Sequence, residues 1–152
     1  MEPRSPRRLA VAFGLVTLAL LATACALSSP GARIFQLGEG HSGAIPRSAM
    51  GGPYSTSGPG CAFCHGDKGQ GTGQAPSITR ATLGSSHSIR HMRSAADQNP
   101  APVTEGPWTA AQTVEVVRTG VTPEGNHLGG RMPRWQLDTQ DGNALAGFLG
   151  TL

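Results

Sequence analysis

The sequence has few of the residue patterns that identify enzymes, nucleotide-binding proteins or zinc proteins. Only three of its 152 residues are cysteines, and two of them form a single C-x-x-C pair, so a tetrahedral zinc site would need two further ligands from elsewhere. The glycine-rich segment 66–73 does not have the spacing of a phosphate-binding loop. The acidic side chains are scattered, so no general acid and base are positioned together; the glutamates concerned are Glu39, Glu105, Glu115 and Glu124.

Long apolar runs are also missing. The longest, residues 9–22, is shorter than the roughly 18 residues required to recognise a membrane-spanning helix. It follows three arginines, Arg4, Arg7 and Arg8. A basic stretch followed by a short apolar stretch predicts an export signal over residues 1–25. We expect cleavage near Cys25, and an uncleaved membrane anchor is the alternative.

Once this signal is removed, the remaining chain has no excess of charge of one sign. The full chain has a formal net charge of +3, but removal of residues 1–25 leaves nine basic and eight acidic residues. The basic character is therefore mostly a targeting feature, and no nucleic-acid partner is expected. The remaining chain fits one domain, which we expect to follow a short tether at residues 26–30 and to span residues 31–152.

One short run is specific. Residues 61–65 read Cys-Ala-Phe-Cys-His, and C-x-x-C-H is the attachment signature of a c-type haem. Cys61 and Cys64 can each add to one haem vinyl group, and His65 can place its imidazole on the iron as an axial ligand. We therefore predict one covalently bound haem c. A zinc site that uses the H-x₃-H pair at residues 87–91 and a thioredoxin-like redox motif are weaker alternatives, the latter because this Gly/Pro-rich chain shows no βαβ pattern.

The third cysteine, Cys25, has no disulfide partner if the other two hold haem. The preceding residues 21–24 (Leu-Ala-Thr-Ala) resemble a bacterial lipoprotein processing site, although they also fit an ordinary A-x-A cleavage site. A free thiol would be awkward in an oxidising compartment, which favours lipidation of Cys25 as the first mature residue. We expect an exported protein on the periplasmic side, anchored to the membrane through this lipid, or otherwise soluble in the periplasm or secreted.

Helix signals stand near both ends of the mature chain. A short helix is expected over residues 31–37, where Gly31 and Phe35 share one face. A last helix is expected after the capping residue Asp138, and its apolar stripe includes Phe148. We expect Phe148 to contact Gly31 and Phe35.

A further helix is expected between these two. It begins at Thr109, which forms a capping box with Gln112, and ends at Gly120. Residues 38–60 are rich in Gly, Pro and Ser and show neither a helix nor a strand period, so we interpret them as an extended loop. The region 83–107 is interpreted as irregular because of its prolines.

Met132 lies between the last two predicted helices, in the segment 129–135. A thioether is a soft donor that favours ferrous over ferric iron, and we predict that Met132 is the second axial ligand. Trp135 is expected to line the haem pocket, and Arg131 or Arg134 could reach a haem propionate. A core methionine without metal contact is the alternative for Met132. The competing iron ligands are Met50, Met92, His41, His87, His91 and His127.

Together these features resemble a small class I c-type cytochrome, and the resemblance covers residues 31–152. It is carried by Gly31 and Phe35, the segment 61–66, Met132-Pro133 and the closing helix. The resemblance implies an all-α fold of three to four short helices around one haem, with long irregular loops. It also implies that the carbonyl of Pro76 accepts the Nδ1 proton of the proximal histidine. Residues 38–60 are an insertion relative to the simplest members.

The function that this resemblance implies is electron transfer rather than catalysis. The protein would carry electrons between a donor and an acceptor protein, with both axial positions of the iron filled, and could be the haem subunit of a larger redox complex. The alternative is a haem enzyme or a sensor of gases or peroxide with an open or labile distal site.

Overall fold

The structure is a computed structural model that describes residues 29–48, 52–90 and 102–152. The predicted signal peptide 1–25 with Cys25, and most of the tether 26–30, lie outside these residues. Three of the competing haem ligands also lie outside them: Met50, His91 and Met92. No helix in the three described ranges has the length and apolar character needed to cross a membrane.

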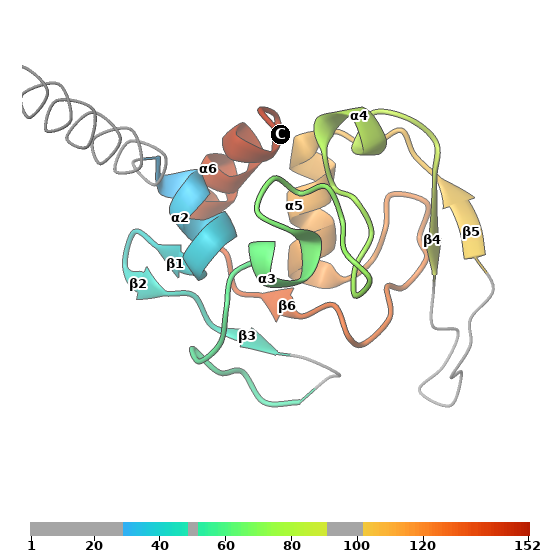
Figure 1. The fold of residues 1–152 in the computed structure, drawn as a ribbon. Coiled ribbons are helices and arrows are strands. Elements are labelled where there is room, and N and C mark those ends of the chain that lie inside the picture. Colours follow the sequence, from blue (N-terminus) through green and yellow to red (C-terminus); the bar gives the residue numbers. More distant parts are fainter. Residues whose placement is uncertain (1–28, 49–51, 91–101) are drawn as a thin grey trace, which may run out of the picture.

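Helices α2 (Pro30–Leu37) and α6 (Thr139–Leu149) pack against each other (Figure 1). A Cβ atom added to Gly31 would lie 2.1 Å from the carbonyl oxygen of Ala144, so the two backbones approach too closely for a side chain here. Next to this crossing the rings of Phe35 and Phe148 stack at 5.3 Å between centroids. The predicted contact between the first and last helices is confirmed.

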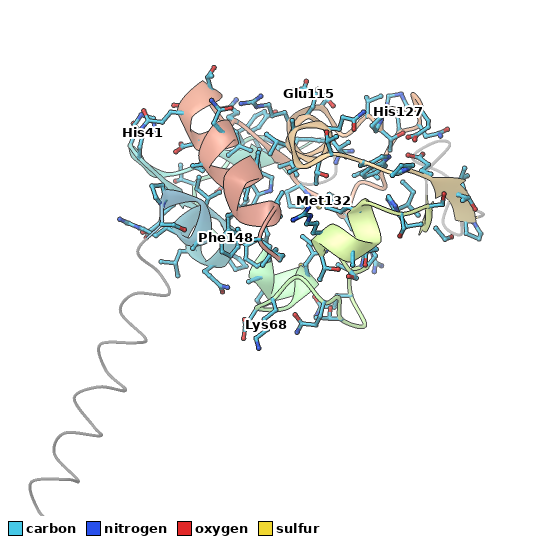
Figure 2. The ribbon with its side chains drawn as sticks, turned by 90° about the horizontal axis from the view of Figure 1, so that it is seen from above. His41, Lys68, Glu115, His127, Met132 and Phe148 are labelled. Carbon is cyan, nitrogen blue, oxygen red and sulfur yellow. The ribbon has the colours of Figure 1, made fainter. Side chains whose placement is uncertain are left out.

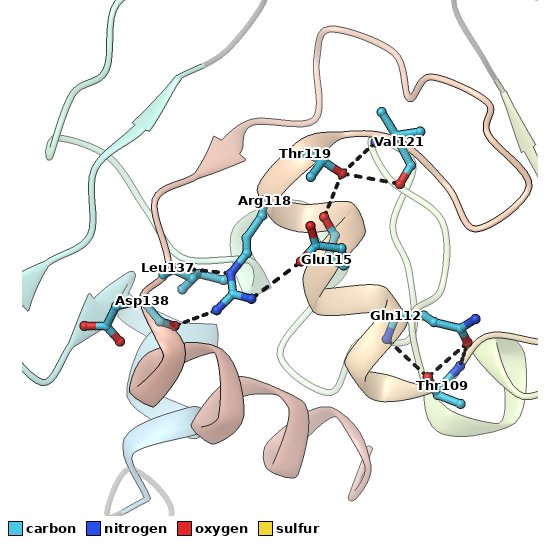
Figure 3. A network of polar contacts seen from close by, with 8 residues as sticks. All are labelled: Thr109, Gln112, Glu115, Arg118, Thr119, Val121, Leu137 and Asp138. Atoms are coloured by element: carbon cyan, nitrogen blue, oxygen red, sulfur yellow. Dashed lines mark hydrogen bonds and ion pairs between the residues drawn. The ribbon is translucent and has the colours of Figure 1, made fainter.

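Helix α5 (Ala110–Thr119) lies beside α6. Its N-terminus has the predicted capping box, in which the Thr109 hydroxyl accepts the Gln112 amide proton at 3.1 Å and Gln112 Oε1 accepts the Thr109 amide proton at 2.8 Å (Figure 3). Gly120 ends the helix with a φ of 72°, a conformation that favours glycine. Arg118 donates hydrogen bonds to the carbonyls of Leu137 and Asp138, which fixes the start of α6 against α5.

The all-α expectation is incomplete, because three antiparallel two-stranded sheets accompany the five helices of the described residues. The sheets are β1 (Glu39–Gly40) with β2 (Gly43–Ala44), β3 (Arg47–Ser48) with β6 (Arg134–Trp135), and β4 (His87–Arg90) with β5 (Pro102–Glu105). Strands β1 to β3 lie in the segment 38–60 that we expected to be a structureless loop, and β4 and β5 lie in the region 83–107 that we expected to be irregular. Two-residue strands are too short to show a period of two, and Pro102 is tolerated because it occupies the first position of its strand.

The two remaining helices are one turn each: α3 (Ala62–His65), formed by the C-x-x-C-H segment, and α4 (Arg80–Leu83). The main hydrophobic core lies among α2, α5 and α6 and includes Phe35, Leu145 and Trp135; Cys61 and Met132 are partly buried against it. A second cluster, with Leu83, Ile89, Trp108 and Val116, lies beneath α4 and β4. The described residues thus form two small hydrophobic cores, and helix α5 contributes side chains to both.

Candidate functional site

The two cysteines of the C-x-x-C-H segment stand on one helical turn. The amides of Cys64 and His65 donate to the carbonyl of Cys61 at 3.2 and 3.0 Å, and residues three apart in such a turn share a face. Both cysteines are free and partly buried. Burial raises the pKa of Cys61 to about 12. Two neighbouring thiols on one side of α3 are the arrangement that addition to two vinyl groups requires.

His65 is held in a defined tautomer. Its side chain is buried, and Nδ1 lies 2.8 Å from the carbonyl oxygen of Pro76. A carbonyl can only accept, so Nδ1 carries the proton and Nε2 keeps a lone pair for a metal ion. Burial lowers the pKa of His65, and the hydrogen bond to Pro76 partly opposes this shift. His65 is therefore neutral, as an iron ligand must be.

The glycine-rich loop after His65 makes this contact possible. Gly69 and Gly71 have φ angles of 66° and 87°, and the amide of Gly71 donates to the carbonyl of His65 at 2.8 Å. A Cβ atom on Gly71 would lie 2.7 Å from the amide nitrogen of Ser77. The loop thus turns back tightly on itself and returns the carbonyl of Pro76 to the imidazole.

Met132 is fixed by the turn that carries it. Its amide donates to the carbonyl of Gly129 at 3.0 Å, and its side chain packs against the same core cluster as Cys61. Arg134 donates to the carbonyls of Met132 and Leu128, at 2.6 and 3.1 Å, from either end of the loop. Figure 2 shows Met132 toward the middle of the molecule rather than at its rim. The two hydrogen bonds of Arg134 show that this residue holds the methionine loop, and its contact with a propionate stays a prediction.

Arg47 is a site residue that the sequence did not reveal. It is only 8% exposed, its guanidinium lies 4.7 Å from the centroid of the Trp135 ring, and its Nη2 atom has no hydrogen-bond partner among the described residues. Burial lowers the pKa of Arg47, although the nearby Cys61 raises it. An unpaired buried guanidinium is costly, so this position calls for an anion. No local pattern could have shown this, because the residue is placed by the pairing of β3 with β6, in which Arg47 faces Trp135.

Trp135, predicted to line the pocket, is buried beneath Arg47 and against Gly38. The histidines that compete as ligands have other partners. His41 faces Asp138 and Asp141, and His87 donates from Nδ1 to the carbonyl of Ser85 while its ring meets the edge of Trp108.

The donor set fits a haem. It offers two neighbouring thiols, an imidazole nitrogen with a free lone pair, a thioether in a fixed loop and a buried guanidinium without a partner. The two thiols provide the attachment chemistry of haem c. The imidazole nitrogen and the thioether sulfur are suitable axial ligands, and the guanidinium suits a propionate carboxylate.

Comparison with known proteins gives one match. A family model described as Cytochrome c matches residues 54–152, a segment that contains the C-x-x-C-H turn and Met132 but not helix α2. No curated protein and no solved structure matches.

Proposed function

The chain belongs to the cytochrome c family, and from this premise we propose that it is a single-haem electron carrier with His65 and Met132 as axial ligands of the iron. Proteins of this family bind haem c covalently, so haem c is the cofactor. Bound haem supplies one-electron exchange between ferrous and ferric iron. The observation that carries the proposal is the hydrogen bond from His65 Nδ1 to the carbonyl of Pro76. Because this bond holds the proton on Nδ1, Nε2 keeps a lone pair that can bind iron beside the two cysteines.

The other residues prepare the site for electron exchange rather than for a reaction. Cys61 and Cys64 anchor the cofactor on α3, and the carbonyl of Pro76 orients His65. The side chain of Arg134 holds the Met132 loop through hydrogen bonds to backbone carbonyls, so the thioether can stay in place when the charge of the iron changes. Arg47 would pair with a propionate, which would satisfy its free Nη2.

The test is the absorption spectrum of the purified ferric holoprotein. We expect the weak near-infrared band of methionine-to-iron ligation, and its loss in Met132→Ala. Met92→Ala, which removes a competing methionine, should keep the band. A wild-type protein without the band, or a band that persists in Met132→Ala, would contradict the assignment and favour the enzyme or sensor alternative. Binding of carbon monoxide to the untreated wild type would favour the same alternative.

We also propose that the protein is exported and anchored through a lipid on Cys25. The support is the basic and apolar order of residues 1–22 and the cysteine that follows. Mass spectrometry of the mature N-terminus tests this: a diacylglyceryl group on Cys25 is expected, whereas an unmodified N-terminus would indicate a soluble exported form. An electron carrier in this place would exchange electrons with a donor and an acceptor protein at the membrane surface.

A further inference from the structure

A second group of metal-binding side chains lies away from the haem residues. His41 stands in the turn between β1 and β2, Asp138 is the N-cap of α6, and Asp141 is in the first turn of α6. One ligand atom from each residue lies within 4.8 Å of the other two. Figure 2 shows His41 at the edge of the molecule, far from the central Met132. We propose that these three residues bind a divalent cation of the zinc type.

The distances fit ligands around one ion better than direct hydrogen bonds. His41 Nδ1 lies 3.5 Å from Asp138 Oδ2 and 3.3 Å from Asp141 Oδ1. Charge-assisted hydrogen bonds are shorter, at about 2.7–2.9 Å. Bonds of about 2.0–2.1 Å from zinc to nitrogen and oxygen, in tetrahedral geometry, separate neighbouring ligand atoms by about 3.4 Å. The imidazole nitrogen is therefore spaced from each carboxylate oxygen as it would be with a metal ion between them.

Asp141 offers a carboxylate that is already held in place beside His41. Its side chain is only 8% exposed, and the carboxylate is pressed against Gly40, where an added Cβ atom would lie 2.1 Å from Oδ2. Oδ1 accepts the backbone amide proton of His41 at 2.9 Å, whereas Oδ2 accepts no hydrogen bond from the described residues. Oδ2 is not among the buried atoms that lack a partner, so it is open to solvent or to a bound cation, whose positive charge would neutralise the carboxylate.

The arginines near these residues do not supply that charge. In the described part of the chain, Arg33 pairs with Glu39, and Arg118 pairs with Glu115 and with backbone carbonyls. The N-terminus of α6 contributes about half a positive charge, which is less than the two negative charges of Asp138 and Asp141.

The donor set selects the class of ion. A neutral imidazole and two carboxylates balance a charge of +2, and a nitrogen donor favours zinc over magnesium or calcium, which prefer oxygen ligands. The side chains of His41 and Asp138 are 37% and 53% exposed, so water can complete the coordination. The ion would connect the β1–β2 turn to the start of α6. This site is independent of the proposed electron transfer.

The experiment is a calorimetric titration of the untagged, chelator-washed holoprotein with Zn²⁺. We expect one equivalent to bind to the wild type, and binding in His41→Ala to be weaker by about tenfold or more. Asp138→Asn should also bind more weakly, although asparagine keeps the N-cap of α6. His127→Ala, which removes another exposed imidazole, is the matched control and should bind like the wild type.

Thermal unfolding gives a second readout, because a ligand that binds only the folded state raises the midpoint. Zn²⁺ should raise the midpoint of the wild type and of His127→Ala, but not that of His41→Ala. The proposal is overturned if the wild type shows no saturable binding, or if His41→Ala binds as tightly as the wild type. Either result would leave the methionine band of the haem spectrum unaffected, so this failure is distinct from a failure of the electron-carrier proposal.

Discussion

Some residues in this protein are positioned by neighbours in the sequence and others by distant segments. Arg134 lies in the same short segment as Met132, and its contacts are local. Its side chain donates hydrogen bonds to the carbonyls of Met132 and Leu128. Arg47 precedes the C-x-x-C-H turn in a segment without any period, yet it is buried against Trp135 with one nitrogen unpaired. Arg134 thus holds a loop, whereas Arg47 has the role that we propose for it, which is to offer a charge to the haem pocket.

A substitution of Arg47 tests that second role. A positive charge near the haem favours the reduced state, so Arg47→Gln should lower the reduction potential by tens of millivolts, where 1 kcal/mol corresponds to about 40 mV for one electron. A spectroelectrochemical titration measures the shift. Arg33→Gln is the control, because the side chain of Arg33 is 52% exposed and pairs with Glu39. An unchanged or raised potential in Arg47→Gln would show that Arg47 does not face the cofactor.

At the scale of elements, the three longer helices of the described residues were predictable and the strands were not. Ser29, Thr109 and Asp138 cap α2, α5 and α6 through hydrogen bonds to amides three residues on. These contacts lie within one helical turn, so a short sequence window contains both partners. The strands pair residues from separate segments, and a run of two residues has no pattern of its own.

The crossing of α2 and α6 predicts opposite effects for two glycines. Gly31→Ala should destabilise the protein by about 1–3 kcal/mol, because the new Cβ atom would meet the carbonyl of Ala144 and Cβ of Phe148 at 2.1 and 2.7 Å. Gly147→Ala should stabilise it by about 0.5–1 kcal/mol, because nothing lies within 4 Å of the added Cβ and alanine favours the helix. Denaturant unfolding of the holoprotein compares them. Equal effects of the two substitutions would mean that the helices do not cross at Gly31.

At the scale of the whole molecule, the end of β5 is connected to the loop after α5 through a pair of carboxyl groups. Glu105 ends β5 and is buried, and its Oε1 accepts hydrogen bonds from Thr122 and Asn126 at 3.0 and 2.8 Å. Burial raises the pKa of Glu105, and the contact with Glu124 raises it further. The same contact is the main cause that lowers the pKa of Glu124 to about 2. When the pair holds one proton, that proton is therefore on Glu105.

This pair predicts the pH dependence of stability. The pKa of Glu105 is raised in the folded state. Its contribution to the free energy of unfolding is therefore fully present below pH 4.5, the ordinary pKa of a glutamate, and is lost as the pH rises through the folded-state pKa. Glu105→Gln keeps an oxygen for Thr122 and Asn126 but cannot ionise. The free energy of unfolding of this variant should therefore exceed that of the wild type increasingly as the pH rises above 4.5.

Urea unfolding at several pH values measures that difference. Glu115→Gln is the control, since the side chain of Glu115 is 60% exposed, and it should follow the wild type. Parallel curves for Glu105→Gln and the wild type would show that Glu105 does not titrate differently on folding. The contribution of Glu124 has the opposite sign: it is present above 4.5 and is lost only as the pH falls toward 2.

The sequence by itself determined those features whose residues lie close together in the chain. The spacing of residues 61–65 names the cofactor, and the caps and glycines near 109–120 and 138 define two helices, because all partners lie within a few positions. It also identified the contact between Phe35 and Phe148, through resemblance to a family. The tertiary structure alone decided which far segments meet: Arg47 with Trp135, and His41 with Asp141, 100 residues apart. Such pairs leave no periodic signal, because their positions follow from how the helices pack and not from the residues that flank them.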